Sequence, residues 1–248
     1  MTTPISPASG CTDPHQNVAC SSCGLRELCL PVGFTDEEME QLDSLVSMRR
    51  TIRRGETLFR RGDAFASIYA VRAGFFKTCT TNEIGRDQVT GFQMAGELMG
   101  LDGVDEGKHR CDAVALEDSR VCVIPYVALE RLSLAFPALQ RQFHRVMSRE
   151  IVRDHSVMMM LSGMRAEERV AAFLSNLARR LQARGFSPSR FLLRMTRQEI
   201  GTYLGLQLET VSRCFSRFHE EGILEVQQRQ IRILDADALH RILQGPAD

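Results

Sequence analysis

The pattern of hydrophobic and polar positions changes character along this chain of 248 residues. Across residues 50–125, short runs of β-branched and aromatic residues are separated by recurring glycines, which predicts short antiparallel strands joined by turns. After Pro137, hydrophobic residues recur every three or four positions, as they do on one face of an α-helix. The pattern therefore predicts a β-sandwich or roll followed by a helical region.

The segment before the strands combines a loose start with one helix. Residues 1–17 are rich in Pro, Ser, Thr and Gly, which is typical of chain without regular structure. Thr35 and Glu38 have the spacing of a capping box, in which each side chain bonds the other residue's backbone N–H. Hydrophobic residues then follow at helical spacing, so we expect an amphipathic helix here.

A heptad-like stripe marks the first helix after Pro137. Its members follow each other at steps of four, three, four and three: Met147, Ile151, Asp154, Met158 and Leu161. A stripe this short suits a dimer interface attached to other domains. The alternative is that the stripe packs against the chain's own β-domain.

The C-terminal part has the pattern of a helix-turn-helix. Thr196 and Glu199 form a second predicted capping box, and Gly205 supplies a tight turn before a helix at about Leu208–Glu220. We expect the inward face of this second helix to consist of Val211, Phe215 and Phe218. The runs 223–226 and 230–233 are candidate strands of a wing.

The opposite face of the second helix carries side chains that can read a G·C base pair. Arg213 can donate two hydrogen bonds to guanine, Glu209 can accept one from cytosine, and Ser212 lies between them. The alternative is an exposed helix face with an ion pair between positions i and i+4. Gln207 stands where a Ser or Thr would cap this helix, and a lost cap costs about 1 kcal/mol.

The distribution of charge adds to this picture. The net charge is zero, but residues 164–233 hold 12 Arg, no Lys and 7 Glu, a balance of +5, and the remainder has a balance of −5. A basic C-terminal part suggests a polyanionic partner. No apolar run is long enough to span a bilayer and the first 20 residues do not resemble a signal peptide, so we expect a cytoplasmic protein without membrane contact.

Three of the eight cysteines lie close together near the start of the chain. Cys20, Cys23 and Cys29 form a C-x2-C-x5-C pattern. Thiolates at this spacing suit an iron–sulfur cluster or zinc, although the absence of a second ligand pair in the sequence disfavours zinc. No metal at all remains the third alternative. The spacing does not select a fourth ligand from the remaining cysteines, which are Cys11, Cys79, Cys111, Cys122 and Cys214.

Several motifs together resemble the FNR branch of the CRP/FNR family. They are the run ETVSR at Glu209–Arg213, RRGETLFRRGD at Arg53–Asp63, AGELMG at Ala95–Gly100, the cysteine pattern and the striped helix. The resemblance implies an α+β fold in four parts. These are an N-terminal iron–sulfur segment (1–32), a cyclic-nucleotide-binding-like β-roll sensor domain (33–136), a dimerisation helix (137–163) and a winged helix-turn-helix domain (164–248).

The resemblance also implies a function, an oxygen-responsive transcription activator. A [4Fe–4S] cluster held by Cys20, Cys23, Cys29 and Cys122 would promote a homodimer, built on the stripe, that binds TTGAT-type palindromic sites without oxygen. The implied DNA contacts are Glu209, Ser212 and Arg213, to which we add Thr196 and Arg197 at the start of the preceding helix. The alternative is a regulator of the same fold that responds through zinc or thiol redox chemistry, or to another ligand.

The same resemblance also bears on the partners of the protein. RNA polymerase is an implied partner, with contacts at 82–87 and at the turn around Ser187. Cyclic-nucleotide members carry Gly-Glu and a later Arg-Ser pair that holds the phosphate, whereas this chain has Gly96-Glu97 but Arg110-Cys111-Asp112, so we expect no cyclic nucleotide. We interpret Gly96-Glu97 as a turn retained from the shared roll. An enzyme is disfavoured because neither a nucleophile–base set nor a nucleotide-binding glycine loop is visible.

Overall fold

The computed structural model describes residues 19–25, 28–29, 33–46, 48–81, 85 and 87–244. Its helices are η1 (Cys20–Ser22), α1 (Asp36–Leu45), η2 (Leu101–Gly103), α2 (Tyr126–Ala135), α3 (Pro137–Gly163), α4 (Ala166–Gln182), α5 (Arg197–Leu204), α6 (Leu208–Glu220) and α7 (Ala236–Gln244). Its strands are β1 (Met48–Ile52), β2 (Thr57–Phe59), β3 (Ser67–Ala73), β4 (Phe75–Thr81), β5 (Asp87–Met94), β6 (Leu98–Met99), β7 (Asp112–Ala115), β8 (Ser119–Pro125), β9 (Arg190–Leu192), β10 (Leu224–Gln227) and β11 (Gln230–Ile233).

The predicted roll is confirmed as two antiparallel four-stranded sheets. One has the order β1-β8-β3-β6 and the other β2-β7-β4-β5. Buried side chains from both sheets form the core between them, among them Val71, Phe76 and Val121. The short strands follow from the sequence pattern of hydrophobic runs separated by glycines, but most of their partners are distant in sequence, such as β1 with β8 and β2 with β7.

A second core lies on the outer side of the β1-β8-β3-β6 sheet. There α1, α2 and the first half of α3 pack over the sheet through Leu42, Ile68, Ile124, Leu129 and Val146. The capping box predicted at the start of α1 is confirmed, since Glu38 N–H donates to Thr35 Oγ1 and Thr35 N–H donates to Glu38 Oε2. This helical layer positions the cysteine segment described below.

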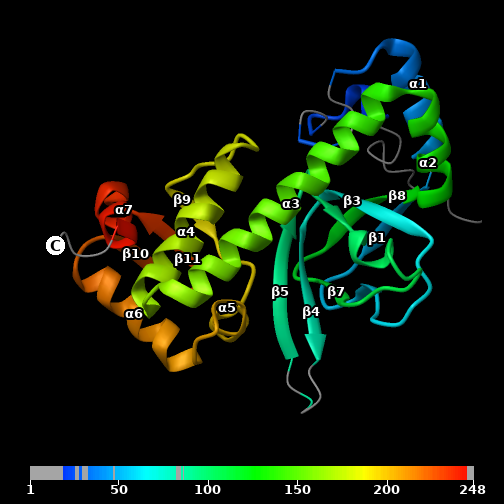
Figure 1. The fold of residues 1–248 in the computed structure, drawn as a ribbon. Coiled ribbons are helices and arrows are strands. Elements are labelled where there is room, and N and C mark those ends of the chain that lie inside the picture. Colours follow the sequence, from blue (N-terminus) through cyan, green and yellow to red (C-terminus); the bar gives the residue numbers. More distant parts are fainter. Residues whose placement is uncertain are drawn as a thin grey trace, which may run out of the picture.

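The long helix α3 connects the roll to the C-terminal domain (Figure 1). It extends over 27 residues from Pro137, which occupies the first turn, where a proline is tolerated. Beyond it, α4, α5 and α6 form the predicted helix-turn-helix core, and β9, β10 and β11 form the wing sheet in the order β10-β11-β9.

The two domains share a continuous hydrophobic core. Strand β5 packs against α4 and α5, and the ring of Phe92 lies 5.1 Å from the ring of Tyr203 and 6.0 Å from that of Phe173. Lys77 on β4 forms an ion pair with Glu199 on α5 at 2.8 Å. The C-terminal domain is therefore docked on the roll of its own chain. Within the described residues, every helix is too short or too polar to cross a lipid bilayer.

Candidate functional site

Four cysteines from two distant segments line one cavity. They are the cysteines named above as cluster ligands: Cys20, Cys23 and Cys29 from the N-terminal segment, and Cys122 from β8. The rest of the wall is mostly apolar, with Leu42, Val46 and Ile124 among its residues. We call this space the cysteine cavity. All four cysteines are in the reduced form, and all four side chains are partly exposed.

Backbone and side-chain contacts tie the cysteine segment to its surroundings. The carboxylate of Asp43 on α1 accepts hydrogen bonds from the backbone N–H of Cys20 and, at 3.0 Å, from Ser21 Oγ. Gln142 on α3 is buried and donates through Nε2 to the carbonyl oxygen of Cys29 at 3.1 Å. The segment is thus attached directly to the helix that bears the predicted dimer stripe.

The environment of Cys20 and Cys122 favours the protonated form of these two thiols. Burial, then Asp43, and then the neighbouring Cys29 and Cys122 raise the pKa of the Cys20 thiol well above its usual range. Burial also raises the pKa of Cys122, although Arg49 and Arg72 oppose the shift. A bound cation would reverse this preference, because a metal ion stabilises the thiolate form.

The cysteine cavity supplies the donor type and enclosure that a thiolate-bound metal group requires, but not a preformed coordination geometry. Across the described residues, no group of three or more His, Cys, Asp or Glu side chains is placed to hold a metal ion. The four thiols would have to approach each other around the metal. An added Cβ at Gly24, beside Cys23, would meet no atom within 4 Å, so a side chain there would have space.

The other cysteines in the described residues lie elsewhere. Cys79 is buried in β4, and Cys214 is buried in α6 against the helix-turn-helix core. Cys111 precedes β7, and its thiol donates to Asp102 Oδ2 at 3.4 Å. Cys11 lies outside the described residues. Of the four described candidates for a fourth ligand, only Cys122 borders the cavity.

The helix-turn-helix has the local geometry that the sequence predicts. Thr196 Oγ1 accepts from Glu199 N–H at 3.1 Å, and Glu199 Oε2 accepts from Thr196 N–H at 2.7 Å, which confirms the capping box. Gly205 ends α5 with a φ of +63°, in the left-handed region. A Cβ at Gly201 would lie 2.7 Å from the carbonyl oxygen of Leu206, a close approach between α5 and the turn that sequence reasoning missed.

Helix α6 separates its faces as predicted. Val211, Phe215 and Phe218 are all buried. Glu209 and Arg213 are exposed and Ser212 is half-buried, near the N-terminal end of the helix. Arg213 donates to Thr210 Oγ1 at 3.4 Å, and the described ion pairs include none between Glu209 and Arg213. As predicted, the side chain of Gln207 makes no capping hydrogen bond.

Arg197, the first residue of α5, lies next to this face with unused hydrogen-bonding capacity. Its guanidinium stacks over the ring of Phe215, with 3.3 Å between Cζ and the ring centre. Its Nη1 is buried without a hydrogen-bond partner. Burial lowers the pKa of Arg197 to about 10, so the side chain remains charged at neutral pH.

The predicted stripe on α3 is largely exposed in the single chain. Met147, Ile151 and Met158 are 36%, 53% and 58% exposed, and Asp154 is also exposed. Leu161 differs, because it is half-buried and lies close to Gly205 of the chain's own helix-turn-helix. Val152 and Met159 are exposed on the same helix and were missed, because they fall outside the heptad steps.

The segments predicted to contact RNA polymerase lie only partly within the described residues. Of the first segment, residues 82–84 and 86 lie outside the described residues. In the second, Ser187 is exposed and follows Phe186, which is a large exposed hydrophobic residue.

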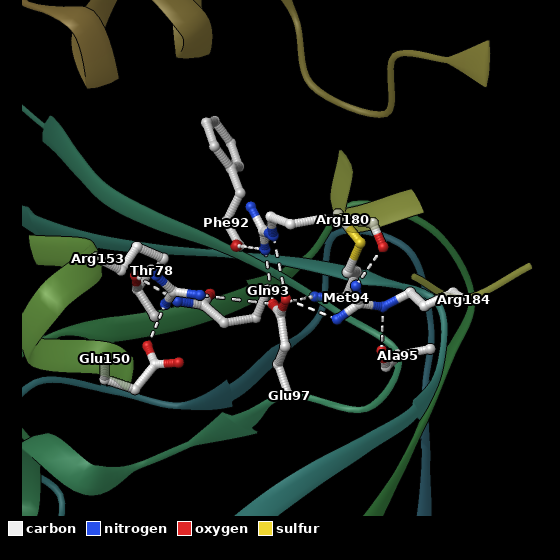
Figure 2. A network of polar contacts seen from close by, with 10 residues as sticks. All are labelled: Thr78, Phe92, Gln93, Met94, Ala95, Glu97, Glu150, Arg153, Arg180 and Arg184. Carbon is white, nitrogen blue, oxygen red and sulfur yellow. Dashed lines mark hydrogen bonds and ion pairs between the residues drawn. The ribbon is translucent and has the colours of Figure 1, made fainter. Parts of the chain in front are cut away.

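The interpretation of Gly96-Glu97 as a retained turn was incomplete. The two residues do form the turn between β5 and β6, with φ of +88° at Gly96. The carboxylate of Glu97, however, forms ion pairs with three arginines (Figure 2). Two of them lie one turn apart along the chain, Arg180 in the last turn of α4 and Arg184 just beyond its C-terminal end. That spacing is visible in the sequence, but the sequence alone does not show which acidic residue faces them.

Comparisons with known proteins agree with this architecture. Residues 49–135 match the cyclic nucleotide-binding domain, and residues 168–242 match the Crp-like helix-turn-helix domain. The chain is 49% identical to the transcriptional regulatory protein btr of Bordetella pertussis over 224 residues, which cover 90% of this chain and 93% of that protein. It is 46% identical to the transcriptional activator protein FnrA of Stutzerimonas stutzeri over 229 residues, covering 92% and 94%.

A solved structure gives the same result. FixK2 from Bradyrhizobium japonicum superposes with a TM-score of 0.74 and 30% sequence identity, covering 81% of this chain and 98% of FixK2. Since relatives of nearly half identical sequence extend over about nine-tenths of the chain, shared ancestry accounts for the roll, the long helix and the helix-turn-helix together. The chain therefore belongs to the CRP/FNR family of transcription regulators.

Proposed function

We propose that this protein is a transcription activator that responds to oxygen through a [4Fe–4S] cluster and binds DNA as a homodimer when the cluster is present. One observation carries the proposal: Cys122 of β8 and three cysteines of the N-terminal segment border a single, mostly apolar cavity. Thiolates are the usual protein ligands of iron–sulfur clusters. The activator role rests on similarity to FnrA, a protein named as a transcriptional activator.

The residues of the cysteine cavity have distinct roles in this proposal. Cys20, Cys23, Cys29 and Cys122 hold the cluster, and Asp43 anchors the segment that carries three of them. When bound, the cluster supplies a redox group that reacts with oxygen. Gln142 links the carbonyl of Cys29 to α3, so a change in the segment reaches the dimerisation helix directly.

The dimer would form along α3 through Met147, Ile151, Asp154, Met158 and Leu161. The exposed hydrophobic side chains among these support an interface, because burying them against a second copy removes apolar area from water. Two facing Asp154 carboxylates would repel each other across the twofold axis. The dimer is then marginal without the cluster, and Leu161 contributes least because it already packs against its own domain.

DNA recognition would use one helix from each copy. Glu209 and Arg213 read the G·C pair of a TTGAT-type half-site, and Ser212 contributes beside them. Arg197 and Thr196 contact a phosphate near the N-terminus of α5. A dimer would place the two helices about 34 Å apart, one turn of DNA, so separation of the copies should abolish specific binding.

The roll would act without a cyclic nucleotide. At the Arg110-Cys111 position, where nucleotide-binding members hold the phosphate, the carboxylate of Asp102 accepts the backbone N–H of Arg110 at 2.7 Å and of Cys111 at 3.2 Å. Its negative charge repels an incoming phosphate. We further propose a cytoplasmic location, polymerase contacts at 82–87 and the Ser187 turn, and the four-part organisation predicted from the sequence.

Purification without oxygen tests the proposal. We expect iron and sulfide in equal amounts, and binding to a TTGAT palindrome that disappears when air releases the cluster. Zinc without sulfide would instead favour the same-fold regulator with a zinc or thiol switch. Protein free of metal that binds the palindrome equally well in air would overturn the proposed oxygen response.

A further inference from the structure

A carboxylate in the β5–β6 turn connects the roll to the C-terminal domain. Glu97 is only 13% exposed. One of its oxygens, Oε2, accepts the backbone N–H of Met94 at 3.0 Å, which fixes the carboxylate to its own turn. The turn is in addition fixed to β3, because Gly96 N–H donates to Val71 and Val71 N–H donates to the carbonyl oxygen of Glu97. Glu97 is therefore a rigid part of the roll.

The same carboxylate binds three arginines outside the roll, one on α3, one on α4 and one just after α4. Arg180 on α4 donates through Nε at 3.0 Å and Nη2 at 2.6 Å, a bidentate contact. Arg184, just beyond the C-terminal end of α4, donates through Nη2 at 2.7 Å, and Arg153 on α3 approaches to 3.6 Å. We call these four residues the Glu97 cluster (Figure 2).

The charges of the Glu97 cluster are mutually dependent. Burial opposes ionisation of Glu97, but Arg180, Arg153 and Arg184 outweigh it and lower the pKa of this carboxyl. Conversely, the arginines are 5–20% exposed and would be left as enclosed cations without Glu97. Breaking one partner of an enclosed pair is costly, because the remaining charge is neither solvated nor paired.

The other side of this turn contacts the cysteine segment. A Cβ built on Gly96 would lie 2.9 Å from the Cβ of Leu28, which shows how closely Leu28 packs on the turn. Leu28 directly precedes Cys29. Gly96 borders the cysteine cavity and also the groove lined by Arg153, Arg180 and Arg184. One turn thus contacts the cysteine segment on one side and the C-terminal domain on the other.

We propose that Glu97 is a positioning residue through which the cysteine segment controls the orientation of the helix-turn-helix on its own roll. Leu28 holds the β5–β6 turn, and Glu97 holds α4, against which α5 and α6 pack in one core. This inference rests on the proposed function, because cluster binding is the event that would change the cysteine segment. It adds a route within each copy that is separate from the Gln142 contact and from dimerisation along α3.

The test compares two isosteric substitutions in ion pairs that join the same two domains. Glu97→Gln removes the charge of the Glu97 cluster, whereas Glu117→Gln removes the partner of Arg194 in a contact away from the cysteine segment. For each variant we would measure iron and sulfide, dimer fraction by sedimentation, affinity for a TTGAT palindrome, and amide hydrogen exchange in α4 with and without the cluster.

We expect wild-type iron content and dimer fraction for both variants. Glu97→Gln should lower DNA affinity about tenfold, within the 5- to 150-fold range usual for coupling between sites, and abolish the cluster-dependent change in α4 exchange. Glu117→Gln should retain both. Arg184→Lys keeps the positive charge but weakens the fork geometry, so it should give a smaller loss and serves if Glu97→Gln does not fold.

The outcomes separate the inference from the proposed function. Wild-type protein without iron, or with the same DNA affinity in the presence and absence of the cluster, overturns the proposed function. The inference alone is overturned if wild-type protein behaves as proposed but Glu97→Gln does not differ from it. In that case the variant would have the same DNA affinity and the same amide exchange in α4. An equal loss of DNA affinity in Glu117→Gln also overturns the inference, because any weakened contact between the two domains would then have the same effect.

Discussion

The recognition helix and the cysteine cavity differ in how far along the chain their parts come from. Helix α6 gathers Glu209, Ser212 and Arg213 within a single turn and a half, so their common face follows from helical spacing. The cysteine cavity joins β8 to a segment near the N-terminus, and packing between α1, α3 and the sheet brings them together. The three residues of α6 form what we call the reading face. Local periodicity thus organises the reading face, whereas tertiary contacts organise the candidate metal centre.

The largest effect is expected from removal of Cys122, the cavity residue that folding brings in from a distant strand. Cys122→Ser should abolish iron incorporation, because the distant ligand is lost, and reduce DNA affinity to the non-specific level, a loss of about a thousandfold or more. Iron analysis and a binding titration without oxygen measure both. The matched control is Cys111→Ser, which retains a donor for Asp102 and should keep iron and DNA binding. Equal iron in both variants would remove Cys122 from the ligand set.

The next effect concerns the reading face alone. Arg213→Ala should weaken binding to the palindrome by about 1–3 kcal/mol and reduce the preference for the G·C pair, since a bidentate contact to guanine is lost. Its iron content should not change. Arg217→Ala is the control, because Arg217 lies one turn later and pairs with Glu167 and Glu221. A loss of iron in Arg213→Ala would contradict the separation between the two regions.

A smaller effect is expected at α3, the helix that lies between the cysteine cavity and the reading face. Asp154→Ala should tighten the dimer in air about tenfold, equivalent to about 1.4 kcal/mol, because the repulsion between facing carboxylates disappears. Sedimentation of the cluster-free protein provides the measurement. Glu130→Ala on α2 is the matched control, as an exposed acidic residue away from the stripe. Dimer fractions that coincide for Asp154→Ala and wild type would place Asp154 outside the interface.

The smallest expected effect tests local structure at the start of α6. Gln207→Ser should stabilise the protein by about 1 kcal/mol, because the backbone at this position is extended and the glutamine side chain makes no capping hydrogen bond. The free energy of unfolding in denaturant measures this, with Gln207→Ala as the variant that cannot cap. An increase in iron content would be unexpected, since this position belongs to the reading region.

The same contrast explains what could be predicted from the sequence. Both capping boxes, the buried face of α6 and the turn at Gly205 follow from spacing within a few residues, and the structure confirms them. The β-roll followed from the alternation of short hydrophobic runs and glycines, and the family comparison confirms it. These features depend on local preferences that the surrounding fold does not reverse.

Features that depend on distant contacts could not be derived in the same way. Spacing left the fourth thiol open, because nothing local distinguishes Cys122 in its strand from a core cysteine. The Glu97 cluster was missed because Arg180 and Arg184 lie more than eighty residues from their partner. The position of Leu161 against Gly205 likewise depends on how α3 meets the C-terminal domain.

The central claim is that iron bound by the four thiols decides whether two copies remain together on DNA. The most direct measurement follows sedimentation and operator binding of one anaerobic sample while oxygen is added in steps, with iron and sulfide determined at each step. The account predicts about four iron and four sulfide per chain at the start, and a parallel loss of cluster, dimer and binding. A dimer that keeps its operator after all iron has been released would contradict it.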